Sequence, residues 1–143
     1  ELIFPEDALI ANDMEKGTSF SEVMIDNVPN DALILDIGSK TIENINEFLS
    51  SVSTVVWCGP LGLFELNPFQ TGTVSVAKEI SKLTKDGKLI SVAGGGDTVA
   101  ALSQSNYNRD FTYISTAGGA FLELLAGESL PGIEVLKIDS EEK

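Results

Sequence analysis

The chain has 143 residues, of which 43% are hydrophobic and 22% are charged, a composition that favours one compact globular domain over a disordered chain. Nine Lys and Arg residues against 22 Asp and Glu residues give a formal net charge of −13, so the surface should repel nucleic acid and anionic membranes. One cysteine, Cys58, and no histidine exclude an internal disulfide and the usual Cys/His zinc sites.

No apolar run approaches the roughly 18 residues of a membrane helix, and the opening ELIFPEDALI is acidic where a signal peptide would be basic. We therefore expect a cytoplasmic protein that contacts no membrane. The chain starts at Glu1, and residues 2–4 already read as the end of a strand. We expect the natural beginning to lie upstream.

Strands and helices alternate along most of the chain. After an extended piece at 9–11, short apolar and β-branched strands are predicted at residues 33–37, 54–58, 88–93 and 111–115. Helices are predicted at residues 39–49, 69–82, 97–104 and 118–125. This alternation predicts an α/β fold with a parallel sheet and helices on both faces. Ligands bind such sheets at the carboxyl ends of the strands.

The segment VAGGGDT, residues 92–98, ends a strand in three glycines and opens a helix with Asp97. Such glycines allow close approach of the backbone, and the free amides of the helix start can bind phosphate. Asp97 and Thr98 could add a magnesium-side carboxylate and a hydroxyl. A plain βα turn with Asp97 as N-cap explains the pattern equally well. The spacing matches neither the P-loop nor the dinucleotide fingerprint.

Two further strands end in loops of interest. In ISTAGGAFLELLAG, residues 114–127, Gly118 and Gly119 open a helix beside the first glycine loop, which would suit a polyphosphate, although close helix packing also demands glycine. In VVWCGPLGLFE, residues 55–65, an apolar loop ends in Glu65. It could hold an adenine and a ribose, or represent core packing followed by a solvated acid. Trp57 is predicted to be a core residue.

These three segments together resemble phosphoglycerate kinases. VVWCGPLGLFE is similar to the W-N-G-P-x-G-x-F-E segment of that family, VAGGGDTVAA to its G-G-G-D-[ST] loop, and the stretch from residue 114 to residue 136 to its closing S-T-G-G-G-A segment. With weaker matches at IFPEDALIA and LILDIGSKT, the resemblance covers nearly the whole chain. It implies a Rossmann-like three-layer domain, here incomplete: residues 1–143 would be the C-terminal portion of the nucleotide-binding domain.

The resemblance also implies roles for particular residues. Glu65 would bind the ribose, Pro60 and Leu63 would line the adenine pocket, and the loop of Gly95, Gly96, Asp97 and Thr98 would hold the phosphates, with Asp97 on the Mg²⁺ side. The amides of Gly118 and Gly119 would meet the transferred phosphoryl group. Gly95, Gly96, Gly118 and Gly119 would thus act on the reaction, which needs alignment and charge stabilisation.

Three positions depart from the family pattern. Cys58 stands where an asparagine is usual, which removes a hydrogen-bond donor. Ala117 replaces the first glycine of the triplet and narrows the backbone angles available there. Tyr113 replaces a common histidine.

The resemblance implies a glycolytic phosphotransferase as parent, expected to be a monomer, that uses Mg²⁺ and converts 1,3-bisphosphoglycerate and ADP into 3-phosphoglycerate and ATP. The phosphoglycerate would bind a basic N-terminal domain for which this chain has no counterpart. We therefore expect the chain alone to be inactive. A non-catalytic nucleotide-binding module is the alternative from another class. An NAD-dependent oxidoreductase is a third, and the glycine pattern disfavours it.

Overall fold

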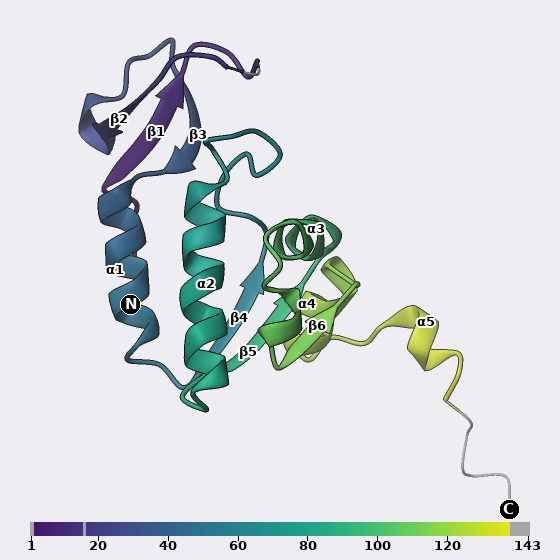
Figure 1. Cartoon of the computed structure of the whole chain (residues 1–143). Coiled ribbons are helices and arrows are strands. Elements are labelled where there is room, and N and C mark those ends of the chain that lie inside the picture. The colour runs from purple at the N-terminus through teal and green to yellow at the C-terminus, as the bar shows by residue number, and fades with distance from the viewer. Residues whose placement is uncertain (1, 16, 138–143) are drawn as a thin grey trace, which may run out of the picture.

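A computed structural model describes residues 2–15 and 17–137 and shows two small sheets connected by helices (Figure 1). The strands are β1 Asp7–Ala11, β2 Phe20–Met24, β3 Leu33–Ile37, β4 Thr54–Cys58, β5 Ile90–Gly94 and β6 Tyr113–Ser115. The helices are α1 Ser39–Leu49, α2 Thr71–Lys85, α3 Gly96–Gln104, α4 Gly119–Leu125 and α5 Pro131–Glu134, with short 3₁₀ turns at η1 Ile25–Asn27 and η2 Asn108–Asp110.

The first sheet is antiparallel and has the order β2-β1-β3. The prediction that residues 33–37 belong to the parallel sheet is therefore wrong. All five residues of β1 are buried, so this strand lies in the centre and is paired along both edges. Strand β3 pairs with the second edge of β1. The alternation of strands and helices could not predict this pairing, because it joins segments that are far apart in the chain.

The second sheet is parallel and has the order β4-β5-β6. Val56 is paired with Val92 and Val92 with Tyr113, and the ends of β4 and β5 meet at Cys58 and Gly94. The predicted α/β class is confirmed by this sheet and its connecting helices. The main core lies between the sheet and α2, whose inward residues recur at helical spacing: Val76, Ala77, Ile80 and Leu83.

The two faces of the parallel sheet differ. Helices α2 and α3 bury one face, where Trp57 and Ala93 join the core. On the other face Val56, Ile90 and Tyr113 are 46%, 54% and 59% exposed. There α4 covers the carboxyl end, because Phe121 packs so closely on β5 that a Cβ on Gly94 would lie 2.6 Å from its Cδ1. The expectation of strands buried on both faces thus holds only at that end.

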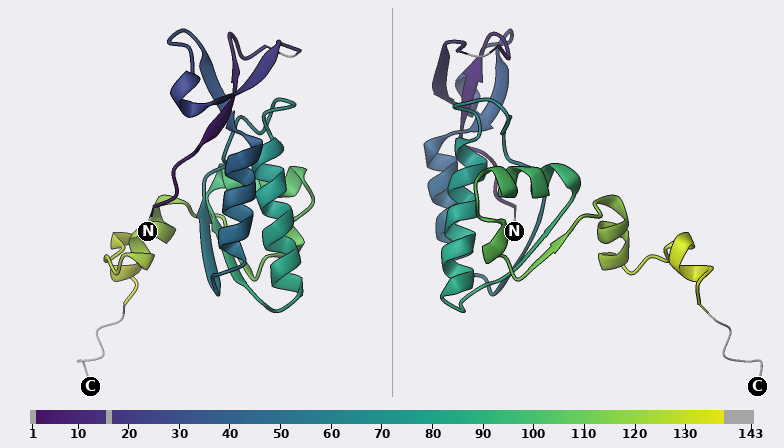
Figure 2. Two further views of the ribbon diagram at one scale, coloured as in Figure 1. Left: turned by 90° about the vertical axis from the view of Figure 1, so that its left-hand side faces the viewer. Right: turned by 45° about the vertical axis from the view of Figure 1, so that its right-hand side comes forward.

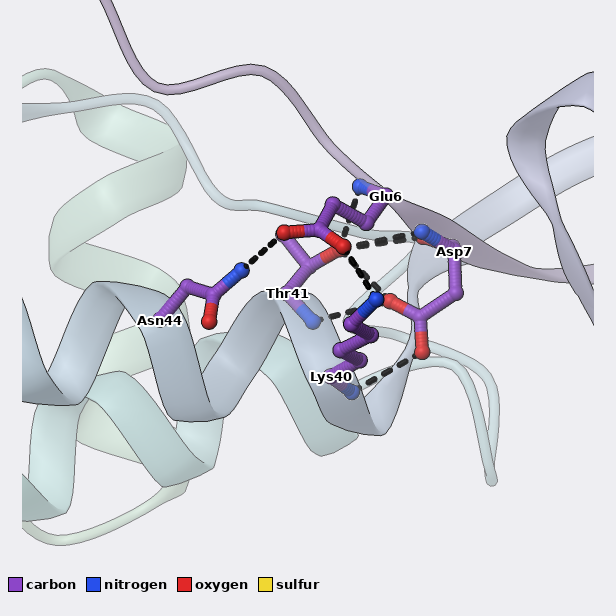
Figure 3. Close-up of polar contacts among 5 residues, drawn as sticks. All are labelled: Glu6, Asp7, Lys40, Thr41 and Asn44. Carbon is purple, nitrogen blue, oxygen red and sulfur yellow. Dashed lines mark hydrogen bonds and ion pairs between the residues drawn. The ribbon is translucent and has the colours of Figure 1, made fainter.

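A polar cluster joins β1 to α1 (Figure 3). The Asp7 carboxylate accepts hydrogen bonds from the backbone N–H groups of Lys40 and Thr41, both at 2.8 Å, and from the Thr41 hydroxyl at 2.6 Å. The Thr41 oxygen in turn accepts the backbone N–H of Glu6 at 3.0 Å. Glu6 also forms an ion pair with Lys40 and accepts a bond from Asn44. The antiparallel sheet is therefore attached to the first turn of α1.

The views in Figures 1 and 2 show α5 standing away from the rest of the protein, beyond α4. Leu136, which follows α5, is 77% exposed. In the part of the chain that the structure describes, none of the helices combines the length and the apolar character that crossing a bilayer requires.

Candidate nucleotide site

The first glycine loop connects β5 to α3. Gly95 occupies the N-cap position with φ = 99° and ψ = 141°, a conformation that glycine adopts readily and other residues rarely. The helix begins at Gly96, so Asp97 is the exposed second residue of α3. The alternative reading of Asp97 as the N-cap is wrong. Its carboxylate lies in the first turn, where the helix dipole favours negative charge.

The start of α3 is open. In the described part of the chain, the backbone N–H groups of Gly96, Asp97 and Thr98 donate no hydrogen bond to an acceptor outside α3. No Lys or Arg occurs between Lys88 and Arg109 in the sequence. An anion at this position would therefore be bound by backbone amides.

The second glycine loop lies against the first. Gly118 is the N-cap of α4, and a Cβ placed on it would lie 3.3 Å from the Cα of Gly95. Ser115 shapes the turn, because its hydroxyl oxygen accepts the N–H of Ala117 at 3.2 Å. The starts of α3 and α4 are thus adjacent, as the sequence predicted. Ala117 needs no unusual angle, since Asn106 is the sole non-glycine residue with positive φ in the described chain.

The loop after β4 begins beside the same edge. Gly59 has φ = 97°, and its N–H donates to the Thr98 hydroxyl oxygen at 2.7 Å. Cys58 is exposed, and its Sγ would lie 3.8 Å from a Cβ on Gly95. Trp57 is a buried core residue, as predicted, and its Nε1–H donates to the Gly59 carbonyl. Residues that follow three different strands therefore meet here: Gly59, Gly95 and Gly118.

The remaining predicted site residues lie further along the loop. Pro60 is half-buried, and Leu63 is half-buried against the second core around Phe69. Glu65 is exposed, seven residues beyond the end of β4. In the part of the chain that the structure describes, no hydrogen bond joins Glu65 to either glycine loop. The structure thus brings together the residues predicted to bind phosphate, whereas Glu65, predicted to bind the ribose, is not hydrogen-bonded to them among the described residues.

Two features of the site's surroundings escaped the sequence reasoning. Thr98 was assigned to the phosphates, but it is 1% exposed and its oxygen is bonded to Gly59. Asp36 was not singled out, but its carboxylate accepts the N–H of Gly72 at 2.7 Å and that of Ile37 at 2.9 Å. Burial outweighs these two hydrogen bonds and raises the pKa of Asp36 to about 6. Neither role has a local sequence signature.

A metal at this edge would depend on few protein ligands. No cluster of three or more His, Cys, Asp or Glu side chains suited to a metal ion occurs among residues 2–15 and 17–137. Asp97 is the carboxylate next to the open amides. This arrangement suits Mg²⁺, which commonly takes one or two carboxylates together with substrate phosphates and water.

Comparisons with known proteins agree with the motifs. A family model described as "Phosphoglycerate kinase" matches residues 1–128. The chain is 52% identical over 136 residues to the phosphoglycerate kinase of Methylorubrum extorquens (strain PA1), covering 95% of this chain and 34% of that protein. It is 53% identical over 137 residues to that of Rhodopseudomonas palustris, covering 96% of this chain and 34% of that protein.

Solved structures give the same result. The phosphoglycerate kinase of Coxiella burnetii superposes with a TM-score of 0.83 at 37% identity, over 93% of this chain and 33% of that one. That of Pyrococcus horikoshii OT3 gives 0.75 at 33% identity, over 92% of this chain and 31% of that one. The chain spans about a third of the length of these relatives. It belongs to the phosphoglycerate kinase family.

Proposed function

We propose that this chain is the Mg-nucleotide-binding part of a cytoplasmic, monomeric phosphoglycerate kinase. The parent would transfer a phosphoryl group between 1,3-bisphosphoglycerate and ADP in glycolysis, giving 3-phosphoglycerate and ATP. Residues 1–143 would form the C-terminal portion of its nucleotide domain, of which residues 1, 16 and 138–143 lie outside the described structure. The observation that carries this proposal is the meeting of Gly59, Gly95 and Gly118 beside the open start of α3.

In this proposal each loop binds one part of the nucleotide. Pro60 and Leu63 contact the adenine and Glu65 accepts hydrogen bonds from the ribose, because they follow β4 on one loop. The amides of Gly95, Gly96 and Thr98 hold the phosphates, and Asp97 faces the Mg²⁺. Gly118 and Gly119 direct the start of α4 at the transferred phosphoryl group, where fixed dipoles stabilise charge without reorganisation.

The affinity of the isolated chain should be low. A helix dipole contributes about 0.3–1 kcal/mol at an exposed site, whereas micromolar binding requires roughly 8 kcal/mol. The stretches 41–77, 89–108 and 110–136, which contain the three motifs, have no Lys or Arg. We therefore expect a dissociation constant for Mg-ADP in the millimolar range.

We also expect no turnover of 1,3-bisphosphoglycerate by the 143-residue chain, because this phosphoryl donor would bind to another domain of the parent. A coupled assay on protein purified free of host enzyme measures this. Steady ATP production proportional to the amount of chain would contradict the expectation.

Amide chemical shifts during titration with Mg-ADP test the nucleotide site. The largest changes should fall on the amides of Gly59, Gly95 to Thr98, Gly118 and Gly119. Asp97→Asn should leave the melting temperature within about 2 °C, since surface substitutions change stability by about 0.5 kcal/mol or less. It should abolish the Mg²⁺ dependence of binding, because the metal loses its carboxylate.

Asp86→Asn is the matched control. It removes the same charge from an exposed acid at the C-cap of α2, outside the glycine loops. It should bind Mg-ADP as the wild type does. Equal losses in the two variants would show a general charge effect. Shifts scattered away from the glycine loops would reject the site.

A further inference from the structure

The loop after β4 is held at every second residue. The N–H of Gly59 donates to the Thr98 hydroxyl on α3 at 2.7 Å, and the N–H of Leu61 donates to the Thr73 hydroxyl on α2 at 3.0 Å. The N–H of Leu63 donates to the Leu35 carbonyl on β3 at 2.7 Å. Three neighbouring elements therefore fix the course of one loop.

The two threonines make the same kind of bond in similar surroundings. Each is 1% exposed, and each accepts a backbone N–H from the loop. They differ in what else they touch. Thr98 belongs to the first turn of α3, and its oxygen would lie 3.5 Å from a Cβ on Gly95. Thr73 belongs to α2 and lies outside the glycine loops.

Thr98 is therefore the place where two loops of the proposed nucleotide site are bonded to one another. Its hydroxyl oxygen is buried beneath the glycine loop and is engaged by Gly59. A side chain in this position acts on a ligand through the backbone groups that it holds.

We propose that Thr98 is a positioning residue, whose hydroxyl keeps the Gly59 turn in register with the Gly95–Asp97 loop so that both bind one nucleotide. This inference rests on the proposed function and assigns to the Thr98 side chain a role other than direct contact with phosphate. The Gly59–Thr98 bond spans 39 residues of sequence, so it couples segments that local structure leaves independent.

Three substitutions separate this role from general stabilisation. Thr98→Val keeps the shape of the side chain but leaves the Gly59 N–H without its acceptor. Thr98→Ser keeps the acceptor. Thr73→Val is the matched control, because it removes an equivalent buried acceptor from the same loop without touching the glycine loop.

The measurements are hydrogen exchange of backbone amides in the ligand-free 143-residue chain and an NMR titration with Mg-ADP. In Thr98→Val the Gly59 amide should exchange about tenfold faster and the Mg-ADP affinity should fall by about fivefold to tenfold, the scale of one lost buried hydrogen bond. Thr98→Ser should restore both. Thr73→Val should speed exchange at Leu61 and lower Mg-ADP affinity less than Thr98→Val does, because it loosens one anchor of the loop after β4 but leaves that loop bonded to the glycine loop.

The outcomes are distinct. Unchanged Mg-ADP affinity in Thr98→Val, or an equal loss in Thr73→Val, overturns the positioning role while the nucleotide site stands. Failure of Thr98→Ser to restore the affinity overturns it as well. A wild-type chain whose glycine-loop amides do not respond to Mg-ADP overturns the proposed function and this inference with it.

Discussion

The starts of α1 and α3 present the same backbone groups but treat them differently. At the start of α1 the N–H of Ser39 donates to the Glu22 carboxylate, and those of Lys40 and Thr41 donate to the Asp7 carboxylate. The protein's own acids thus occupy the place that an anion would take. At the start of α2 one N–H is engaged in a similar way, because the Gly72 N–H donates to the Asp36 carboxylate.

At α3 the chain supplies a glycine as N-cap and no carboxylate across it. Gly95 has no side chain to offer, and Asp97 is exposed one residue inside the helix. A helix start left unpaired in a folded protein keeps its amides available to solvent or ligand. The start of α3, where binding is proposed, thus differs from the helix starts nearby in being left open, while those are closed by acids from distant strands.

The largest loss of stability is expected from adding a side chain at Gly38, the N-cap of α1. A Cβ on Gly38 would lie 2.2 Å from the Cγ of Asp7, whose carboxylate is held by Lys40 and Thr41. Gly38→Ala should therefore lower the free energy of unfolding by about 3 kcal/mol or more, through overpacking and loss of the cap. Urea unfolding measures this. In the double variant with Asp7→Ala the losses should not add, because the clash has been removed.

A second expected effect concerns the two buried carboxylates and their response to pH. Burial works to raise the pKa of Asp7, but hydrogen bonds from the Thr41 hydroxyl and from the backbone N–H groups of Thr41 and Lys40 outweigh it, so the pKa lies below the ordinary 3.8. Asp36 has only two backbone donors, and burial raises its pKa to about 6. The balance between burial and hydrogen-bond donors decides the direction of each pKa shift.

The signs for stability are opposite. Because the pKa of folded Asp36 lies above its unfolded value of 3.8, ionised Asp36 costs stability above pH 6, up to about 3 kcal/mol, and this cost disappears as the pH falls towards 4. The contribution of Asp7 is present above pH 3.8 and is lost as the pH falls through its lowered pKa. Titration of the side-chain carboxyl carbons by NMR measures both. A pKa for Asp36 below that of Asp7 would contradict the assignment.

Local sequence patterns were sufficient for part of this picture. Periodicity predicted the parallel strands and α2, and glycines at strand ends predicted that the 94–96 and 118–119 loops share one edge. These features depend on neighbouring residues. The Asp97 side chain was harder to place, because an acid after glycines is compatible with both the N-cap and the first turn.

The closed helix starts could not be predicted in the same way. Asp7 lies 33 residues from Lys40, and Asp36 lies 36 residues from Gly72, so no spacing rule connects acid and helix. The membership of β3 in the antiparallel sheet has the same cause, since β1 lies far from it in sequence. The burial of the Thr98 hydroxyl could not be predicted either, because the local sequence is the same whether this hydroxyl faces a ligand or the protein.

The smallest effects on stability are expected at the open start of α3. There, alanine substitutions at two adjacent glycines should change stability by different amounts. Gly95 has φ = 99°, so Gly95→Ala should cost about 1–3 kcal/mol of stability from backbone strain. Gly96 is exposed in the first turn of α3, and a Cβ there would meet no atom within 4 Å.

Gly96→Ala should therefore leave stability unchanged or raise it by up to about 1 kcal/mol, because alanine favours the helix and restricts the unfolded chain. The same methyl group would stand beside the amides proposed to bind phosphate, so Mg-ADP affinity should fall while the melting temperature does not. Differential scanning calorimetry and the NMR titration measure the two quantities on one sample. A Gly96→Ala variant that melts at a lower temperature and binds Mg-ADP equally well would contradict this prediction. It would show that contacts within the protein close the start of α3, as they close the start of α1.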